Sequence, residues 1–348
     1  MNRSWQRRRG SWRCWIAVLA ISASVPCVAA DSQPAKVRIG QVLVHPIPAD
    51  QEVVQRFRLN ADPFEYREES TPEVSQRLTI TRVTFPSPVV TDCAANNTVH
   101  CEYYCPKSEQ KVPAVIVLHI LGGDFPLARL FANMFAERGV AALFLKMPYY
   151  GERREPSNPR RMISDNPRET VEGMTQAILD IRRATAMLAS RPEIDAEQLG
   201  IFGISLGGIT GALAATAEPR LNNVCLLLAG GDIGQVAWES RELEKIRRKW
   251  VERGGTKEEF LAVLREVDPV RYGERVRGRR ILMLNAAQDE LIPRSCTEAL
   301  WTSFGEPPIV WYEGNHYSVI RHILNALHRT STFFAEARAD GPANRPDR

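Results

Sequence analysis

The sequence predicts an α/β protein with a mostly parallel, doubly wound sheet. From residue 112 onward, short apolar runs rich in β-branched residues alternate with longer amphipathic stretches. Strand–helix–strand units of this kind form parallel sheets with right-handed crossovers. The composition, 44% hydrophobic and 25% charged, is that of an ordinary globular protein with enough apolar residues for a full core.

The predicted elements follow in order along the chain. Residues 76–85 alternate between apolar and polar side chains, and residues 98–104 form a second strand, so an antiparallel pair of strands leads the sheet. The later strands are expected at 114–119, 140–146, 199–204, 224–229, 280–285 and 309–312. The helices are expected at 127–138, 169–190, 206–217, 297–304 and 319–335.

The first thirty residues have the pattern of a secretory signal peptide. Residues 1–13 carry five arginines and no acid, residues 14–25 are apolar, and small residues precede Asp31. We expect cleavage after Ala30 and export to the periplasm or medium, with the twin-arginine route left open. The apolar run is too short for a stable membrane span.

Removing this segment changes the charge balance of the chain. The net charge of +4 comes from 45 basic and 41 acidic residues, and the signal takes five arginines with it. The mature chain is then close to neutral, which argues against a nucleic-acid partner.

The remaining chain divides into three parts. Residues 31–75 are polar and interrupted by prolines, and are expected to form an N-terminal extension. The main domain is expected over 76–337, followed by a polar tail at 338–348. Within the domain, residues 232–267 are charged and helical and contain no strand, which indicates a helical insertion rather than a crossover.

Three cysteines lie close together in the sequence. We hypothesise a local disulfide from Cys93 to either Cys101 or Cys105, because an exported protein permits disulfides. No His-x-x-His or second cysteine pair completes a set of four ligands, so no metal site is expected.

The residues that suggest chemistry follow predicted strands. Ser205 lies in a G-x-S-x-G motif between a strand and a helix, where a sharp turn lifts the hydroxyl above the sheet. Asp289 and His316 each follow a later strand. Because sites in such sheets lie beyond the carboxyl ends of the strands, the three side chains are expected to meet. His316 would then accept the proton of Ser205, and Asp289 would orient the imidazole.

Two further carboxylates are alternatives to Asp289. Glu290 is its neighbour, and Asp232 follows another strand but opens the insertion, so we favour Asp289. An oxyanion would need backbone N–H donors. The expected donors are Leu206, at the start of the helix that follows Ser205, and Leu121, in the loop after strand 114–119.

Taken together, these motifs resemble the α/β-hydrolase superfamily, especially the dienelactone-hydrolase and prolyl-oligopeptidase-like serine esterases. The likeness covers about residues 112–335. It rests on His119-Ile-Leu-Gly-Gly, Met147-Pro-Tyr-Tyr-Gly-Glu-Arg, the Ser205 motif, Gln288-Asp289-Glu290-x-Ile-Pro293 and Gly314-x-His316. It implies an α/β-hydrolase fold and hydrolysis of a small-molecule carboxylic ester through an acyl-enzyme, without a cofactor. Ile120 departs from the glycine that many members carry there.

Substrate contacts are expected from two regions. Superfamily members often carry a cap where this chain has its 232–267 insertion, which makes Trp238, along with Trp250 and Phe260, a candidate pocket residue. Tyr149 and Tyr150, with the arginines Arg153 and Arg154, follow a predicted strand and are expected near the entrance.

Two other functions stay open. A serine peptidase of the prolyl-oligopeptidase-like type would normally carry a larger N-terminal domain than this chain has. A non-catalytic binding module on a hydrolase scaffold would typically lack one member of the serine, histidine and acid set. The sequence does not indicate the acyl specificity or the oligomeric state.

Overall fold

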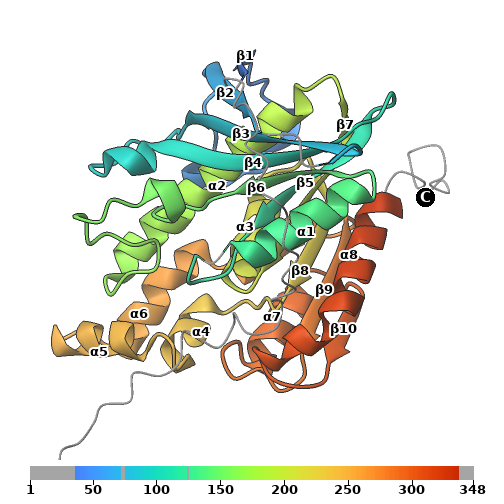
Figure 1. Ribbon diagram of the computed structural model, residues 1–348. Helices are drawn as coiled ribbons and strands as arrows, with labels where there is room; N and C mark the ends of the chain where they lie inside the picture. The colour runs from blue at the N-terminus through green and yellow to red at the C-terminus, as the bar shows by residue number, and fades with distance from the viewer. Residues whose placement is uncertain (1–35, 72–74, 124, 337–348) are drawn as a thin grey trace, which may run out of the picture. The chain divides into compact units, whose positions relative to one another are not determined.

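A computed structural model describes residues 36–71, 75–123 and 125–336. The described part contains a ten-stranded sheet in the order β1-β2-β3-β4-β6-β5-β7-β8-β9-β10, with helices on both faces (Figure 1). The strands β5 to β10 pair in parallel, whereas β1 to β4 pair antiparallel and join the parallel part through β4 and β6. This confirms the predicted fold class.

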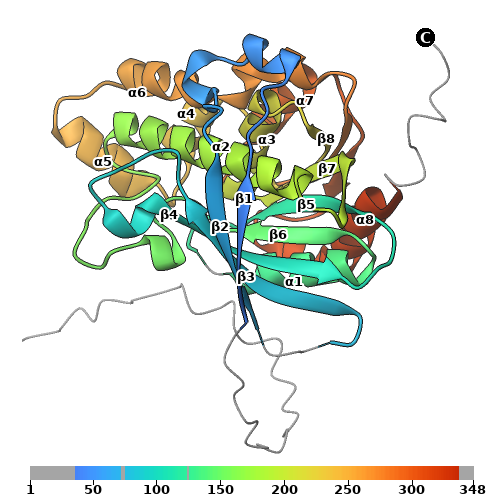
Figure 2. The same ribbon diagram turned by 90° about the horizontal axis from the view of Figure 1, so that it is seen from above.

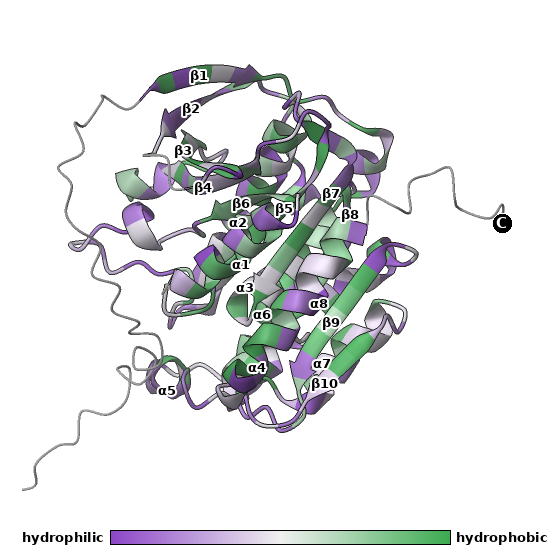
Figure 3. Cartoon of the chain, turned by 45° about the vertical axis from the view of Figure 1, so that its right-hand side comes forward, coloured by the Kyte–Doolittle hydropathy of each residue, from purple (hydrophilic) through white to green (hydrophobic). Residues whose placement is uncertain are grey.

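The strands agree closely with the expected ones from residue 78 onward. They are β1 (Val37–Val42), β2 (Phe64–Ser70), β3 (Leu78–Pro86), β4 (Thr98–Pro106), β5 (Val112–Leu118), β6 (Ala141–Leu145), β7 (Ile194–Ile204), β8 (Leu221–Leu227), β9 (Arg280–Ala286) and β10 (Ile309–Tyr312). Every residue of β5 and β6 is buried, as expected for parallel strands covered on both faces. The parallel strands are largely green in Figure 3 for the same reason.

The helices form two layers. They are α1 (Pro126–Glu137), α2 (Pro167–Ala189), α3 (Leu206–Ala217), α4 (Ile233–Glu239), α5 (Glu244–Glu252), α6 (Lys257–Leu264), α7 (Arg294–Ser303) and α8 (Ile323–Glu336). Short 3-10 helices lie at Pro48–Glu52, Gln55–Phe57, Ala94–Asn97, Gly151–Arg153, Arg265–Val267, Pro269–Val276 and Ser318–His322. The helices α2 and α3 lie on one side of the sheet and α1 and α8 on the other (Figure 2). Each pair contributes to its own apolar cluster.

The sheet begins earlier than the sequence suggests. The strands β1 and β2 lie in the segment 31–75, which the sequence pattern predicts to be an extension. Most residues of β1 are exposed, including the apolar Val37 and Ile39, so this strand has no long buried face that a sequence pattern would reveal. The strand β2 does alternate, with Phe64 and Tyr66 buried.

The structure contradicts the disulfide hypothesis. The described cysteines Cys93, Cys101, Cys105, Cys225 and Cys296 all carry free thiols. The Cys93 thiol points instead to the Arg153 carbonyl, 3.9 Å away. Burial raises the pKa of the Cys101 thiol, so it stays protonated.

The expected insertion contains α4, α5, α6 and the 3-10 helix Arg265–Val267, between β8 and β9 (yellow to orange in Figure 1). A capping box starts α6, in which Thr256 and Glu259 each satisfy a backbone N–H of the other. Phe260 and Leu264 then bury the inner face of α6. None of the helices in the described part has the length and apolar character needed to cross a bilayer.

Candidate active site

Ser205 lies in a strained turn between β7 and α3. Its backbone has φ 55° and ψ −115°, a region that residues other than glycine rarely adopt. Such strain persists only where surrounding contacts hold it. Here the Ser205 N–H donates to the Leu227 carbonyl of β8 at 2.9 Å, and the Ser205 carbonyl accepts the N–H of Ile209 at 2.9 Å.

The glycines of the motif are required because the turn brings backbone segments together. A Cβ at Gly203 would lie 2.0 Å from the Gly207 carbonyl oxygen. A Cβ at Gly207 would lie 2.6 Å from the carbonyl oxygens of Leu118 and His119. In both cases the obstacle is backbone, which cannot move aside, so only glycine fits.

The structure brings together the three residues expected from the sequence. His316 Nε2 lies 3.0 Å from Ser205 Oγ, and His316 Nδ1 lies 2.8 Å from Asp289 Oδ2. The carboxylate can only accept, so Nδ1 carries the proton and Nε2 is free to accept from the serine hydroxyl. This is the geometry that lets a histidine activate a serine as a nucleophile.

Local contacts hold the Asp289 carboxylate in place. Its Oδ1 atom accepts the backbone N–H groups of Leu291 and Ile292, both at 2.9 Å, and its side chain is only 2% exposed. One carboxylate oxygen is thus committed to the backbone, which leaves the other for His316. The carboxylate is oriented before any substrate binds.

The other two carboxylates have different surroundings. Glu290 Oε2 accepts the backbone N–H of His316 at 3.2 Å, so it holds the histidine loop rather than the ring. Asp232 has a left-handed backbone, and its N–H donates to Asp268 Oδ1 at 3.2 Å. Of the three candidates, Asp289 contacts the imidazole.

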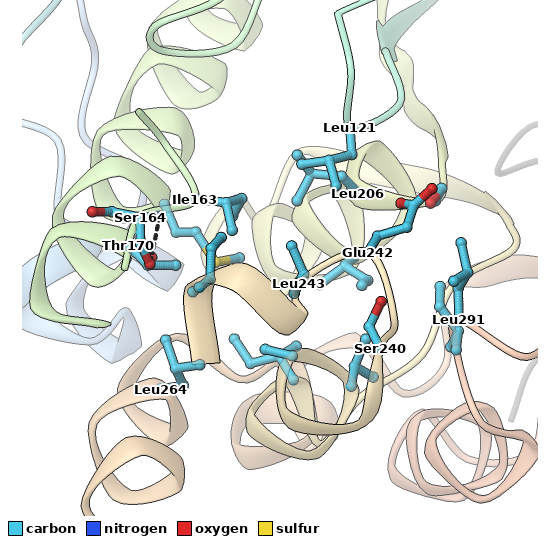
Figure 4. A pocket seen from close by; sticks show the side chains of 18 of the residues that line it. Leu121, Ile163, Ser164, Thr170, Leu206, Ser240, Glu242, Leu243, Leu264 and Leu291 are labelled. Atoms are coloured by element: carbon cyan, nitrogen blue, oxygen red, sulfur yellow. Dashed lines mark hydrogen bonds between the residues drawn. The ribbon is translucent and has the colours of Figure 1, made fainter. Parts of the chain in front are cut away.

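A mostly apolar cavity adjoins Ser205. It is lined by Leu121, Ile163, Ser164, Thr170, Met174, Ser205, Leu206, Ile209, Ile233, Val236, Ala237, Ser240, Glu242, Leu243, Ile246, Phe260, Leu264, Leu291 and Ile292 (Figure 4). Both expected oxyanion residues, Leu121 and Leu206, are among them. Leu206 is the first residue of α3, so its N–H has no acceptor within the helix.

His119 anchors the loop that carries Leu121, a role that sequence reasoning missed. The ring is fully buried, and its Nε2 accepts the Met147 N–H at 3.2 Å. Nδ1 must then carry the proton, which it donates to the Ile120 carbonyl at 2.8 Å. The ring also packs edge-on against Tyr150. Burial lowers the pKa of His119 to about 4, so it stays neutral.

The depressed pKa of His119 predicts a loss of stability in mild acid. The unfolded chain binds a proton near pH 6.5, whereas the folded chain binds it only near pH 4. Between these pH values the unfolded state binds more protons than the folded state. The free energy of unfolding therefore decreases as the pH is lowered, by about 3 kcal/mol in total. Urea unfolding at several pH values should show a smaller loss for His119→Gln. The exposed His328→Gln variant is the control, and equal pH dependence of all three proteins would contradict the prediction.

The three expected substrate residues lie elsewhere. None of Tyr149, Tyr150 and Trp238 is among the cavity-lining residues. Tyr149 is buried, and its N–H donates to Asn96 Oδ1 at 3.0 Å. Trp238 packs edge-on against Phe260 at 5.5 Å, and it is Phe260 that lines the cavity.

The expectation for Arg153 is wrong. Its guanidinium is fully buried and pairs with the equally buried Asp180 at 2.8 Å. It is therefore part of the core, and only its exposed neighbour Arg154 faces solvent. Among the described residues, no group of three or more His, Cys, Asp and Glu side chains could hold a metal ion.

Comparison with known families and proteins gives partial matches. Residues 69–235 match the family described as "Alpha/beta hydrolase domain containing 18". That segment includes Ser205 and ends before Asp289. An uncharacterised protein of Mycobacterium tuberculosis, found in two strains, is 29% identical over 149 residues, or 42% of this chain and 35% of that protein. The chain thus spans about a third of the length of the curated relatives it matches.

Solved structures resemble a larger share of the chain. Acetyl xylan esterase 1 from Thermoanaerobacterium sp. JW/SL YS485 has a TM-score of 0.63 at 18% identity, covering 78% of this chain and 87% of its own. An acetyl xylan esterase from Paenibacillus sp. R4 has a TM-score of 0.60 at 19% identity, covering 86% and 89%. At these identities the likeness concerns the fold, which is that of the α/β hydrolases.

Proposed function

We propose that this chain, an α/β hydrolase by its fold, is an exported serine esterase that cleaves a carboxylic ester through an acyl-enzyme. One observation carries the proposal, the continuous chain of hydrogen bonds from Ser205 through His316 to Asp289. The apolar cavity beside Ser205 provides a place for the substrate. The first thirty residues motivate the export part of the proposal.

The reaction follows from the positions of these groups. Ser205 Oγ attacks the ester carbonyl while His316 Nε2 accepts its proton, and Asp289 stabilises the imidazolium that forms. The carbonyl oxygen becomes an oxyanion facing the N–H groups of Leu206 and Leu121. His316 then gives its proton to the departing alcohol. A water molecule, activated by the same histidine, hydrolyses the acyl-enzyme.

A fluorophosphonate probe tests this proposal directly, because it reacts with an activated serine and needs no knowledge of the substrate. We expect a single adduct on the peptide that contains Ser205, located by mass spectrometry, and no adduct on the Ser205→Ala variant. The exposed Ser108→Ala variant should label like the wild type. An unlabelled wild-type protein that melts cooperatively would refute the proposal and favour a binding module.

Export is tested separately. We expect N-terminal sequencing of the protein recovered from the periplasm or medium of an expressing bacterium to begin at Asp31. Recovery of the full-length chain from the cytoplasm alone would argue against export without affecting the chemistry.

A further inference from the structure

The cavity beside Ser205 has two ends, which lie on either side of Leu121 and Leu206 in Figure 4. Figure 4 views it with Leu121 and Leu206 near the middle. One end, which we call the deep arm, is lined by Ile163, Ser164 and Thr170 in and before α2 and by Leu264 of α6. Met174 and Phe260, which also line the cavity, lie one helical turn from Thr170 and Leu264 and are counted with this arm. The other end, which we call the rim, contains Ser240, Glu242 and Leu291.

The histidine loop lies at the rim. Asp289 Oδ1 accepts the N–H of the rim residue Leu291 at 2.9 Å. The hydroxyl of Tyr317, the residue after His316, donates to Glu242 Oε1. The imidazole therefore approaches Ser205 from the rim side of the cavity.

This position assigns the two halves of the ester, given the proposed function. The alcohol oxygen must leave toward His316 Nε2, which gives it a proton. The carbonyl oxygen must point to the N–H groups of Leu121 and Leu206. The acyl chain then takes the remaining direction, away from the histidine and into the deep arm.

The deep arm suits a hydrocarbon chain. Met174, Phe260 and Leu264 are each only 2% exposed and present apolar atoms. The two polar side chains there already have hydrogen-bond partners: Thr170 Oγ1 accepts the Ser164 N–H at 3.0 Å and donates to the Ser164 carbonyl at 3.5 Å, and Ser164 Oγ donates to Glu169 at 2.6 Å. The rim, by contrast, carries the Ser240 hydroxyl and the exposed carboxylate of Glu242.

We propose that the deep arm binds an aliphatic acyl chain of medium length and that the rim receives a polar alcohol. An acetyl group would occupy only the space beside Leu121 and Leu206. The deep arm would then stay filled with water. Each methylene moved from water into the arm should raise kcat/KM about fourfold. The preferred substrates are then medium-chain esters, with octanoyl favoured over acetyl by at least about a hundredfold.

Variants that fill the arm test this assignment. We expect Leu264→Trp and Ile163→Trp to lose most of the preference for p-nitrophenyl octanoate while still cleaving the acetate ester. Ile163 is only half-buried, so its variant should fold even if the Leu264 variant does not. Ala262→Trp, on the exposed side of the same helix α6, is the matched control and should keep the wild-type profile.

Binding to an inactive variant separates this inference from the proposed function. Calorimetry with Ser205→Ala should detect octanoate and not acetate, and Ile163→Trp added to Ser205→Ala should abolish the octanoate signal. This readout needs no catalysis, so it stands even if fluorophosphonate labelling fails. Two results would overturn the inference: a wild-type preference for acetyl that Ile163→Trp leaves unchanged, or no octanoate binding to Ser205→Ala.

Discussion

Replacement of Asp289 by asparagine is expected to lower kcat for ester hydrolysis by about a thousandfold to ten-thousandfold. An asparagine at this position would keep the backbone contacts, because its Oδ1 can still accept the N–H groups of Leu291 and Ile292. Its amide nitrogen would then face His316 Nδ1 as a donor. The imidazole would have to carry its proton on Nε2, where it can no longer accept one from Ser205. Steady-state kinetics with a p-nitrophenyl ester measure the effect.

The matched control is Asp232→Asn. Asp232 follows another parallel strand and was the alternative acid, but its backbone is left-handed, a conformation that asparagine adopts readily. We expect near-wild-type kcat for this variant. If Asp232→Asn were the slow enzyme and Asp289→Asn the normal one, the assignment of the acid would be wrong. Thermal melting of both variants shows whether the loss is chemical rather than structural.

The parallel part of the fold and the central residues of the site were predictable from local patterns. Each strand of the parallel part has its own apolar run. The turn at Ser205 requires glycine at positions 203 and 207, because the neighbouring backbone leaves no room for a side chain at Gly203 or Gly207. The order of Ser205, Asp289 and His316 along the chain places each of them after a strand, where parallel strands bring their loops together.

The features that were missed depend on partners far away in the sequence. Tyr149 was expected at the entrance but is held inside by Asn96. His119 has no local pattern that distinguishes an anchoring histidine from a catalytic one, and its role follows from the Met147 N–H. The strand β1 has only six residues and most of them are exposed, so burial leaves little apolar pattern in its sequence.

Arg153 is the clearest example of a residue whose position depends on partners that are distant in the sequence. An arginine in a turn after a strand usually faces solvent, yet this guanidinium donates to the carbonyls of Lys146 at 3.1 Å and Asn96 at 2.8 Å. It also pairs with Asp180 of α2, whose Oδ1 accepts the hydroxyl of Ser87 at 2.6 Å. The cluster joins α2 to the turn after β6 and to the loop between β3 and β4. Burial raises the pKa of Asp180, and the charge of Arg153 opposes that shift.

Removal of this guanidinium is expected to cost about 3–5 kcal/mol of unfolding free energy. Arg153→Met would leave the Asp180 carboxylate buried without a counter-charge and would leave two carbonyls without donors. Urea unfolding followed by tryptophan fluorescence measures the loss. Arg154→Met, the exposed neighbour, is the matched control and should change stability by less than about 0.5 kcal/mol.

A second substitution distinguishes an unpaired charge from a simple packing defect. Arg153→Met combined with Asp180→Asn should be more stable than Arg153→Met alone, because a neutral amide needs no counter-charge and its oxygen can still accept from Ser87. The deficit of Arg153→Met should also shrink as pH falls. Its folded-state Asp180 has a raised pKa, so protonation removes the unpaired charge, and stability lost at neutral pH returns in acid. A double variant that is less stable than the single, with a deficit independent of pH, would show that the guanidinium acts through packing alone.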